Sequence, residues 1–373
     1  MTQPRGQRPK VLHFVTGGFS GATQVAVDLV RAHGASGRFD ALLVLRRKRT
    51  TLPERVRALQ ADGLRVELVP GWSHAATVWA LASLCRRFQP DILVAHGYSE
   101  HLWGRYAGLL AGVRHLVHVE HNSRERYNAW RLVQARWLAR RTDAIVGCSE
   151  GVRSALLGYG FPQDRVHAIP NGIRLEPYAN APAHTFVQRI PGIVMAARFA
   201  RQKDHATLLQ AVALLRTRGL RPPVLLAGGG KASARRAAER LAQTLGLADQ
   251  VTFLGHCNDV PGLLKGHQIC VLSTHYEGMP LSLIEGMAAG CAVVGSQVVG
   301  VQEVVDSGRT GLLVEHANPQ ALADALATLL NQPQDAARMA AAAHAEVLQR
   351  YGLNTMTDRY EALLGSLLEK PVL

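Results

Sequence analysis

Short apolar segments alternate with amphipathic helical segments along almost the whole chain of 373 residues. The first half has strand-like runs at 11–16, 41–45, 64–69 and 91–95, and helical patterns lie between them. Alternation at this short spacing indicates parallel strands joined by crossover helices. The chain is therefore predicted to form doubly wound α/β sheets, in which ligands bind beyond the carboxyl ends of the strands.

The chain is long enough for two domains, each with its own core. A second series of strands and helices begins at 193–197, and a polar, Pro/Ala-rich stretch at 176–185 precedes it. We therefore expect a first domain over 1–175 and a second over 186–350. The five cysteines are scattered and form no C-x-x-C pair, which is typical of reduced thiols in a cytosolic protein. No apolar run approaches the 18 residues of a membrane span.

The segment Glu277–Glu285 reads as the loop and first turn of a crossover helix between two strands. Pro280 suits the first helical position, and the amides of Leu281–Leu283 are expected to be free and to form a helix end that suits a phosphate. Glu277 and Glu285 could each bind a pair of sugar hydroxyls. Acidic residues also occur at helix starts only to complement the dipole, and the segment alone leaves both interpretations open.

This Glu-x7-Glu spacing resembles the donor loop of retaining glycosyltransferases of family 4. Their GT-B fold consists of two Rossmann-like, doubly wound domains that face each other across a cleft. The resemblance implies that Glu285 holds the ribose of a nucleotide and that Glu277 holds the donor sugar. The donor-side residues it implies are Gly255, Glu277, Gly278, Met279, Pro280, Leu281, Ser282, Glu285 and Glu303.

Arg198 and Lys203 follow the first strand of the second series. A guanidinium and an ammonium five positions apart could clamp a diphosphate, although a solvated loop explains such a pair as well. The pair matches the donor-phosphate residues of the family in order and context. The sequence contains no D-x-D motif, so the donor charge would be neutralised by Arg198, Lys203 and helix-end amides without a metal.

A glycine loop follows the first strand, with Gly17, Gly18 and Gly21. Glycines there let a ligand approach the backbone, or serve a tight turn, and their spacing is not the dinucleotide fingerprint. The resemblance implies that this loop faces the reaction centre. The acidic residue that often follows the loop in the family is missing, and Thr23 and Gln24 stand in that region.

His121 stands just beyond the strand-like segment Leu116–Val119. The resemblance implies that His121 is the active-site histidine, which contacts the donor sugar near its anomeric carbon. His118 is the less favoured candidate, and His96 and His101 read as ordinary polar residues.

The formal charge of +14 is concentrated in residues 1–175, which hold 25 lysines and arginines against 12 acidic residues. Arg46, Arg47 and Arg49 follow a strand and could contact an acceptor or a phosphate; a solvated loop is an equal alternative. In the helical pattern 123–141, Tyr127, Trp130, Val133 and Trp137 form an apolar stripe. Such a stripe more often packs in a core, while the surrounding arginines leave phosphate or membrane contact open.

The resemblance implies a retaining, metal-independent transfer of a hexose-type sugar from a nucleotide sugar, with UDP favoured over GDP and no cofactor. The acceptor would be a glycan or a lipid-linked sugar of bacterial-type surface polysaccharide or lipopolysaccharide assembly. It would bind the first domain, onto which the C-terminal helix at 353–373 packs back. The charge suggests an anionic inner-membrane surface as partner, and no nucleic acid. The protein would be cytoplasmic, either free or peripheral on the cytoplasmic face of the membrane. A nucleotide-sugar 2-epimerase and a non-catalytic nucleotide-sugar-binding scaffold are the alternatives.

Overall fold

A computed structural model describes residues 8–124, 127–179 and 185–369. The chain divides into two compact units, the first made of Met1–Asn171 with Leu353–Leu373 and the second of Gly172–Gly352. Of the stretch predicted as a linker, Glu176–Ala179 forms the short helix α7 in the second unit, and 180–184 lie outside the described residues.

The first unit contains a seven-stranded sheet in the order β3-β2-β1-β4-β5-β6-β7, and all its strand pairs are parallel. The strands are β1 (Lys10–Thr16), β2 (Asp40–Arg46), β3 (Val66–Val69), β4 (Ile92–His96), β5 (His115–Glu120), β6 (Ala144–Gly147) and β7 (Val166–Ala168). The helices are α1 (Gly21–Ser36), α2 (Pro53–Ala61), α3 (His74–Phe88), α4 (Glu100–Ala111), α5 (Ala129–Ala139), α6 (Glu150–Gly158) and α15 (Leu353–Leu368).

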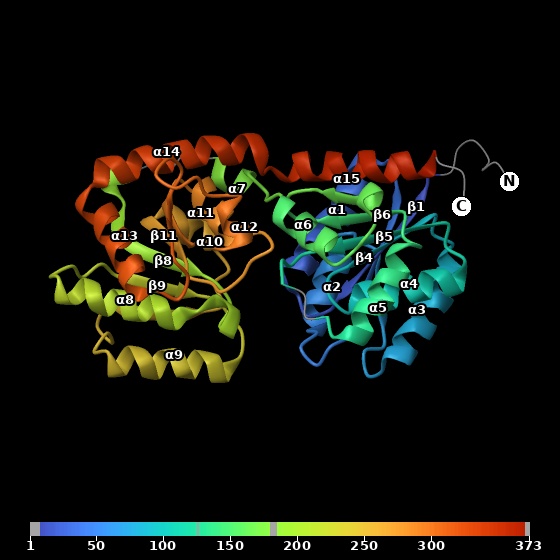
Figure 1. The fold of residues 1–373 in the computed structure, drawn as a ribbon, viewed down its shortest axis with the longest axis horizontal. Helices are drawn as coiled ribbons and strands as arrows, with labels where there is room; N and C mark the ends of the chain where they lie inside the picture. Colours follow the sequence, from blue (N-terminus) through green and yellow to red (C-terminus); the bar gives the residue numbers. More distant parts are fainter. Residues whose placement is uncertain (1–7, 125–126, 180–184, 370–373) are drawn as a thin grey trace. The chain divides into compact units, whose positions relative to one another are not determined.

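Side-chain alternation along the strands divides the core of this unit into two layers. Val11 and Val94 point to the face that is covered by α1 and by α15, the C-terminal helix. Leu12 and Leu93 point to the opposite face, which α3 and α4 cover (Figure 1). Helix α5 lies beside α4 on that second face.

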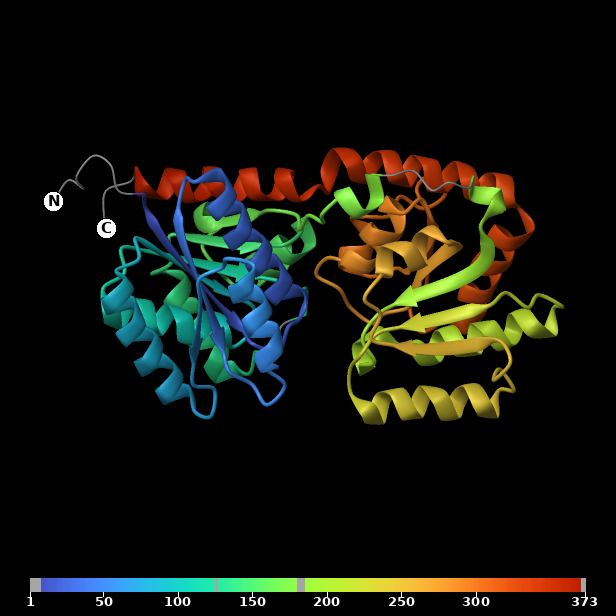
Figure 2. The same ribbon diagram turned by 180° about the vertical axis from the view of Figure 1, so that it is seen from behind.

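The second unit contains a six-stranded parallel sheet in the order β10-β9-β8-β11-β12-β13. Its strands are β8 (Ile190–Ala196), β9 (Val224–Ala227), β10 (Val251–Gly255), β11 (His267–Leu272), β12 (Ala292–Ser296) and β13 (Leu312–Val314). Its further helices are α8 (His205–Thr217), α9 (Ala232–Thr244), α10 (Val260–Lys265), α11 (Leu281–Ala288), α12 (Val299–Gln302), α13 (Pro319–Asn331) and α14 (Pro333–Arg350). Helix α8 packs against α9 and α13, whereas α11 packs against α10 and α14 (Figure 2).

The prediction of two doubly wound, Rossmann-like sheets is confirmed. In the first unit the chain runs outward from β1 through β2 to β3 and then returns to place β4 on the other side of β1. In the second unit it runs from β8 to β10 and returns to place β11 beside β8. The order of the strands thus reverses between β1 and β4 and between β8 and β11, and a ligand is expected at the carboxyl ends of these strands. Among the described helices none is long and apolar enough to cross a bilayer.

Candidate functional site

In the second unit, two loops at the reversal between β8 and β11 are joined by hydrogen bonds. The loop after β8 offers the carbonyl of Gln202, which accepts from the amide of His275 at 2.9 Å and from the hydroxyl of Thr274 at 3.0 Å in the loop after β11. In return, the side-chain amide of Gln202 donates to the carbonyl of Tyr276 at 2.7 Å. These bonds hold the two loops in one arrangement before any ligand binds.

Lys203 and Glu277 meet at this junction. The Lys203 ammonium lies 2.5 Å from Glu277 Oε1. The single proton of the Thr274 hydroxyl is shared between Glu277 Oε1, at 2.8 Å, and the carbonyl of Gln202. The Glu277 side chain is buried and that of Lys203 is only partly exposed. A shielded ion pair of this kind gives the ammonium a defined position, which suits recognition of an anionic group.

Arg198 stands at the carboxyl end of β8 with its side chain exposed. Close backbone packing fixes the strand end: the amide of Phe199 donates to the carbonyl of Gly229 at 2.7 Å. A Cβ atom at Gly228 would lie 2.1 Å from the carbonyl oxygen of Ala197, so a glycine is required there. The amide of Gly228 also donates to Gly255, the last residue of β10, at 2.6 Å. The glycine triplet therefore supports the Arg198 loop.

Helix α11 begins at Leu281, and Pro280 is its N-cap residue rather than the first helical residue. The expectation that the amides of Leu281, Ser282 and Leu283 are all free was wrong. Leu281 donates to the carbonyl of Met279 at 3.1 Å and Leu283 to that of Pro280 at 3.0 Å, because a tight first turn satisfies them internally. The loop before the helix is held by Gly300, where a Cβ atom would lie 2.4 Å from the carbonyl oxygen of Gly278.

Glu285 lies in the second turn of α11 and is half-buried. Burial raises the pKa of its carboxyl group to about 7, and the buried Tyr178 is near enough for its own pKa to be raised, first by burial and further by Glu285. A carboxyl group with this environment gains from hydroxyl donors that would compensate its lost hydration. Glu303 follows α12, and its carbonyl accepts from the hydroxyl of Tyr351 at 3.2 Å.

In the first unit, the glycine loop lies at the reversal between β1 and β4. The Gly17 amide donates to the carbonyl of Arg46 at 2.8 Å, and a Cβ atom at Gly17 would lie 2.7 Å from that oxygen. Gly18 is in the same turn and Gly21 is the first residue of α1. The Thr23 hydroxyl, donating to the carbonyl of Thr16 at 2.9 Å, anchors the start of the helix where the family often has an acidic residue.

His121 lies directly beyond β5, at the same end of the sheet. Its ring approaches the loop after β4, since a Cβ atom at Gly97 would lie 4.0 Å from His121 Cδ2 and 3.8 Å from the Ala22 side chain at the start of α1. Glu120 Oε1 accepts from the backbone amides of His121 at 2.8 Å and Asn122 at 3.3 Å. The turn that carries His121 is thereby held by a buried carboxylate.

The basic run after β2 is only partly available to a ligand. Arg46 is 4 % exposed, and its guanidinium lies 3.4 Å from Glu100 Oε1 and 2.9 Å from His74 Nδ1. The Arg46 guanidinium is therefore already engaged in an ion pair inside the protein, and little of it is exposed for the predicted contact with an acceptor or a phosphate. Arg47 and Arg49 are exposed.

Two family models together span most of the chain. The model described as Glycosyltransferase Family 4 matches residues 19–177, and the model described as Glycosyl transferases group 1 matches residues 181–346. The chain belongs to the GT-B glycosyltransferases of family 4.

Relatives and solved structures agree with this assignment. The putative glycosyltransferase EpsF of Bacillus subtilis is 33% identical over 54% of this chain and 56% of its own length. The lipopolysaccharide core biosynthesis glycosyltransferase LpsE of Rhizobium meliloti is 26% identical over 61% of this chain and 65% of its own. The chain thus matches less than two thirds of the length of these relatives. The crystal structure of Anabaena HepE in complex with UDP and glucose shares the fold, with a TM-score of 0.84 at 21% identity over 96% of this chain and 100% of that one.

Within the described part of the chain, one group of side chains has the composition of a metal site: His101, His118 and Glu120, all buried. Both ring nitrogens of His101 already have partners, because Nδ1 accepts from the Arg105 guanidinium at 2.6 Å and Nε2 lies 2.9 Å from the Tyr127 hydroxyl. A guanidinium in contact with a ligand repels a second cation. The group is better explained as the environment that stabilises buried Arg105.

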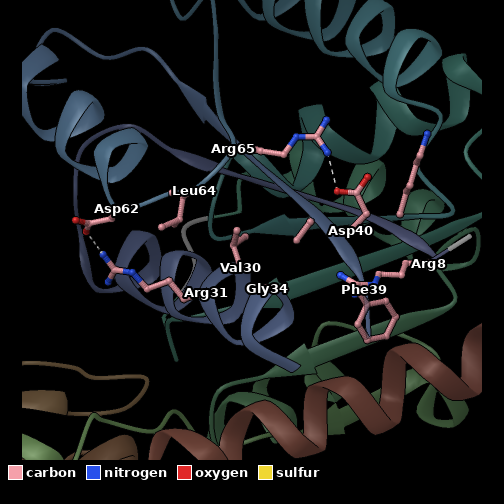
Figure 3. A pocket seen from close by; sticks show the side chains of 12 residues that line it. Arg8, Val30, Arg31, Gly34, Phe39, Asp40, Asp62, Leu64 and Arg65 are labelled. Carbon is pink, nitrogen blue, oxygen red and sulfur yellow. Dashed lines mark hydrogen bonds and ion pairs between the residues drawn. The ribbon is translucent and has the colours of Figure 1, made fainter. Parts of the chain in front are cut away.

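A cavity of about 790 Å³ lies at the amino ends of the strands of the first sheet, around Lys10 and Asp40, which begin β1 and β2. Four of its charged side chains form two ion pairs, Arg31 with Asp62 and Arg65 with Asp40, each at 2.6 Å (Figure 3). Because the cavity is at the amino ends of the strands, it does not coincide with the candidate site at their carboxyl ends.

Three members of the apolar stripe, Trp130, Val133 and Trp137, are exposed to solvent, whereas Tyr127 is half-buried against His101. Helix α5 buries Ala135, Leu138 and Ala139, while Trp130 is 72% exposed and Trp137 44% exposed. The interpretation that this stripe packs in the core was therefore wrong for Trp130, Val133 and Trp137. The hydrogen bonds through Gln202 and Thr274 could not be predicted from the sequence, because bonds between two loops follow no regular spacing along the chain.

Proposed function

We propose that the protein is a retaining, metal-independent glycosyltransferase that moves a hexose-type sugar from a nucleotide diphosphate sugar to an acceptor hydroxyl. The observation that carries the proposal is the pair Lys203–Glu277, held 2.5 Å apart at the strand-order reversal of the second unit. A cation and a sugar-binding carboxylate at such a position suit a nucleotide sugar. The second unit is thus the donor-binding domain and the first the acceptor-binding domain.

The four donor residues have distinct roles in this proposal. Arg198 and Lys203 neutralise the diphosphate, whose negative charge grows as the bond to the sugar breaks. Glu277 holds sugar hydroxyls and orients Lys203, and Glu285 holds the ribose diol. His121 in the first unit contacts the donor sugar near its anomeric carbon.

UDP is the favoured nucleotide, and a glycan or lipid-linked sugar is the favoured acceptor. HepE was crystallised with UDP and glucose, and the name of LpsE places that relative in lipopolysaccharide core biosynthesis. These relatives support a role in the assembly of a surface polysaccharide or lipopolysaccharide.

The first experiment is a thermal-shift screen against UDP, GDP and ADP, followed by a coupled assay of nucleotide release from the corresponding sugars with and without EDTA. We expect UDP to stabilise the protein, because a ligand at 100 times its Kd adds about 2.7 kcal/mol. Nucleotide release should be insensitive to EDTA, and the product should keep the anomeric configuration of the donor in its NMR spectrum. Formation of a new nucleotide sugar would indicate the 2-epimerase, and binding without turnover the scaffold.

The affinity for UDP should depend on the charge of Glu285. If the carboxylate accepts two hydrogen bonds from the ribose, binding favours the ionised form, and its pKa of about 7 makes ionisation incomplete at neutral pH. Affinity should therefore fall below pH 7, by up to about tenfold per pH unit. Titration calorimetry at pH 5.5–8.5 measures this dependence. Glu285→Gln is the matched control: it should bind weakly and lose this component of the pH dependence, and an unchanged profile would contradict the role.

Arg198→Ala should lower kcat more than it lowers donor affinity. The expected loss in kcat/KM is about 10- to 100-fold, in the range of a hydrogen bond to a charged group. Arg218→Ala provides the control, since Arg218 is ion-paired with Asp324 at the far end of α8. A loss of donor affinity with kcat unchanged would indicate ground-state anchoring alone.

The positive charge of the first unit supports contact with an anionic membrane surface. Exposed Trp130, Val133 and Trp137 on α5 extend this surface, and the Arg141 guanidinium lies 3.9 Å from the Trp137 ring. Tryptophan and arginine together are typical of helices at a membrane interface. Arg46 is buried and is not part of the proposed membrane-binding surface, whereas Arg47 and Arg49 are exposed and belong to it.

Vesicle sedimentation tests this surface. Binding should rise with the fraction of anionic lipid and fade at high salt, and it should weaken in Arg47→Glu/Arg49→Glu and in Trp130→Ser/Trp137→Ser. Arg236→Glu/Arg240→Glu in the second unit carries the same charge change and should bind normally. Equal sensitivity of the two arginine pairs, or indifference to lipid charge, would refute the membrane contact.

A further inference from the structure

Three imidazole rings form a hydrogen-bonded row along the carboxyl half of the first sheet. His13 is in β1, His96 ends β4 and His121 follows β5, and these three strands are neighbours. His13 Nδ1 lies 3.0 Å from His96 Nε2, and His96 Nδ1 lies 3.2 Å from His121 Nε2. His13 and His96 are fully buried. His96 therefore stands between two rings and uses both of its nitrogens.

The protons of such a row are coupled. A neutral imidazole has one N–H donor and one acceptor nitrogen, and each ring-to-ring bond requires one of each. If His96 carries its proton on Nδ1, it donates to His121 and must accept from His13. If it carries the proton on Nε2, it donates to His13 and must accept from His121. The proton position on His121 is thus coupled to those on His96 and His13, and with it the character of His121 Nδ1.

The surroundings keep the row neutral. Burial lowers the pKa of His13 and His96 well below the ordinary value, helped by the neighbouring histidines, and burial lowers that of His121 to about 4. Beyond His13, the ring of His33 on α1 is 5.3 Å away, and His33 Nδ1 lies 3.1 Å from Glu361 Oε1 on α15. Arg38 also contacts Glu361, so the charged groups that face this end are paired with each other.

Each end of the row is a buried nitrogen without a hydrogen-bond partner among the described residues: His13 Nε2 at one end and His121 Nδ1 at the other. His121 Nδ1 is the end that lies beyond the last strand of the row, β5. A buried polar atom of this kind is costly unless a ligand group completes it. Whether it can accept from a sugar hydroxyl or donate to an oxygen depends on the proton position that His96 imposes.

We propose that His96, held in place by His13, is a positioning residue that fixes the ring orientation and the tautomer of His121. The link of this device to catalysis rests on the proposed function, in which His121 serves the reacting sugar. The device itself is a property of the first unit and can be observed without substrate.

The test combines NMR with kinetics. The protein is labelled with ¹⁵N-histidine, and the His121 signals are assigned with His121→Asn. In the wild type, the His121 nitrogens should show one tautomer. In His96→Phe, which fills the space without hydrogen bonds, they should show a mixture. In His96→Asn, whose amide can retain a bond to His121 in either orientation, the tautomers should also mix, while activity is partly restored relative to His96→Phe.

In kinetic assays, His96→Phe should lower kcat about 10- to 100-fold with KM for the nucleotide sugar within twofold, because the reacting group is misplaced rather than removed. His115→Phe is the matched control: His115 is equally buried, on β5, and its ring contacts Asp143 instead of the row. It should change neither kcat nor the His121 tautomer.

The outcomes separate the inference from the proposed function. An unchanged single tautomer of His121 in folded His96→Phe overturns the inference, whatever the activity. A mixed tautomer in His96→Phe, but not in His115→Phe, supports it even if no transferase activity is found, in which case the proposed function alone fails.

Discussion

His121→Ala is expected to lower kcat by at least about 100-fold, the lower range for loss of a positioned proton-transfer or hydrogen-bonding group. UDP affinity should stay near the wild-type value, because the proposed nucleotide contacts are all in the second unit. The physical basis is the unpartnered Nδ1 of His121, which burial keeps neutral by lowering the pKa to about 4. Initial rates of nucleotide release and calorimetry with UDP measure the two quantities.

A structural role for His121 would produce a different result. Glu120 holds the turn through backbone amides, so the alanine variant keeps those bonds and should fold. Its thermal midpoint should be within a few degrees of that of His115→Ala, which removes a buried ring elsewhere on β5. Near-normal turnover in a folded His121→Ala would refute the catalytic role.

Acid is expected to destabilise the first unit steeply between pH 6.5 and 4. Burial lowers the pKa of His13, His96, His101, His118 and His121 in the folded state. The unfolded chain therefore binds protons in this window that the folded chain does not, and the free energy of unfolding falls as the pH falls. Each such group contributes about 1.4 kcal/mol per pH unit, so even two would remove about 2.8 kcal/mol per unit from a typical stability of about 5–15 kcal/mol.

Urea unfolding at pH 4.5–8, followed by tryptophan fluorescence, measures this effect, since all five tryptophans are in the first half of the chain. His96→Phe removes one titrating group and should reduce the slope of the free energy of unfolding against pH by roughly 1.4 kcal/mol per pH unit.

Glu285 has the opposite effect in the second unit, because burial raises its pKa: the stability that it contributes is lost as the pH rises from about 4.5 through 7. A first unit whose stability is flat from pH 6.5 to 5 would contradict the prediction.

The local pattern of the chain was sufficient for the fold class and for several site positions. Alternating apolar and amphipathic segments predicted two doubly wound sheets, and both are present. Lys203 and Glu277 were selected from different loops, and the structure brings them together. This succeeded because carboxyl ends of parallel strands meet at one edge of a sheet, so residues just beyond two strands become neighbours.

Predictions that depended on solvent exposure or on hydrogen-bond partners were less successful. The stripe of Trp130, Val133 and Trp137 has a core-like spacing but faces solvent, because the smaller residues Ala135 and Ala139 pack on the other side of α5. In the sequence, Arg46 looks like part of a solvated basic run, but in the structure it is buried and forms an ion pair with Glu100 on α4. Spacing identifies which residues share a face of a helix, but not which face a neighbour covers.

The sequence by itself determined the class of the two sheets, because this follows from the short-range periodicity of its segments. The resemblance of its Glu-x7-Glu segment to a known family indicated the family and the loops that carry the candidate donor residues. Only the tertiary structure decided that His13, His96 and His121 form one row. Their positions are 83 and 25 residues apart, and they meet because β1, β4 and β5 are adjacent and in register. Successive side chains of a strand point to opposite faces of the sheet. His121 therefore lies on the face covered by α1, and His118, three positions earlier, lies on the opposite face. Strand order is a long-range property, and no local pattern in the chain specifies it.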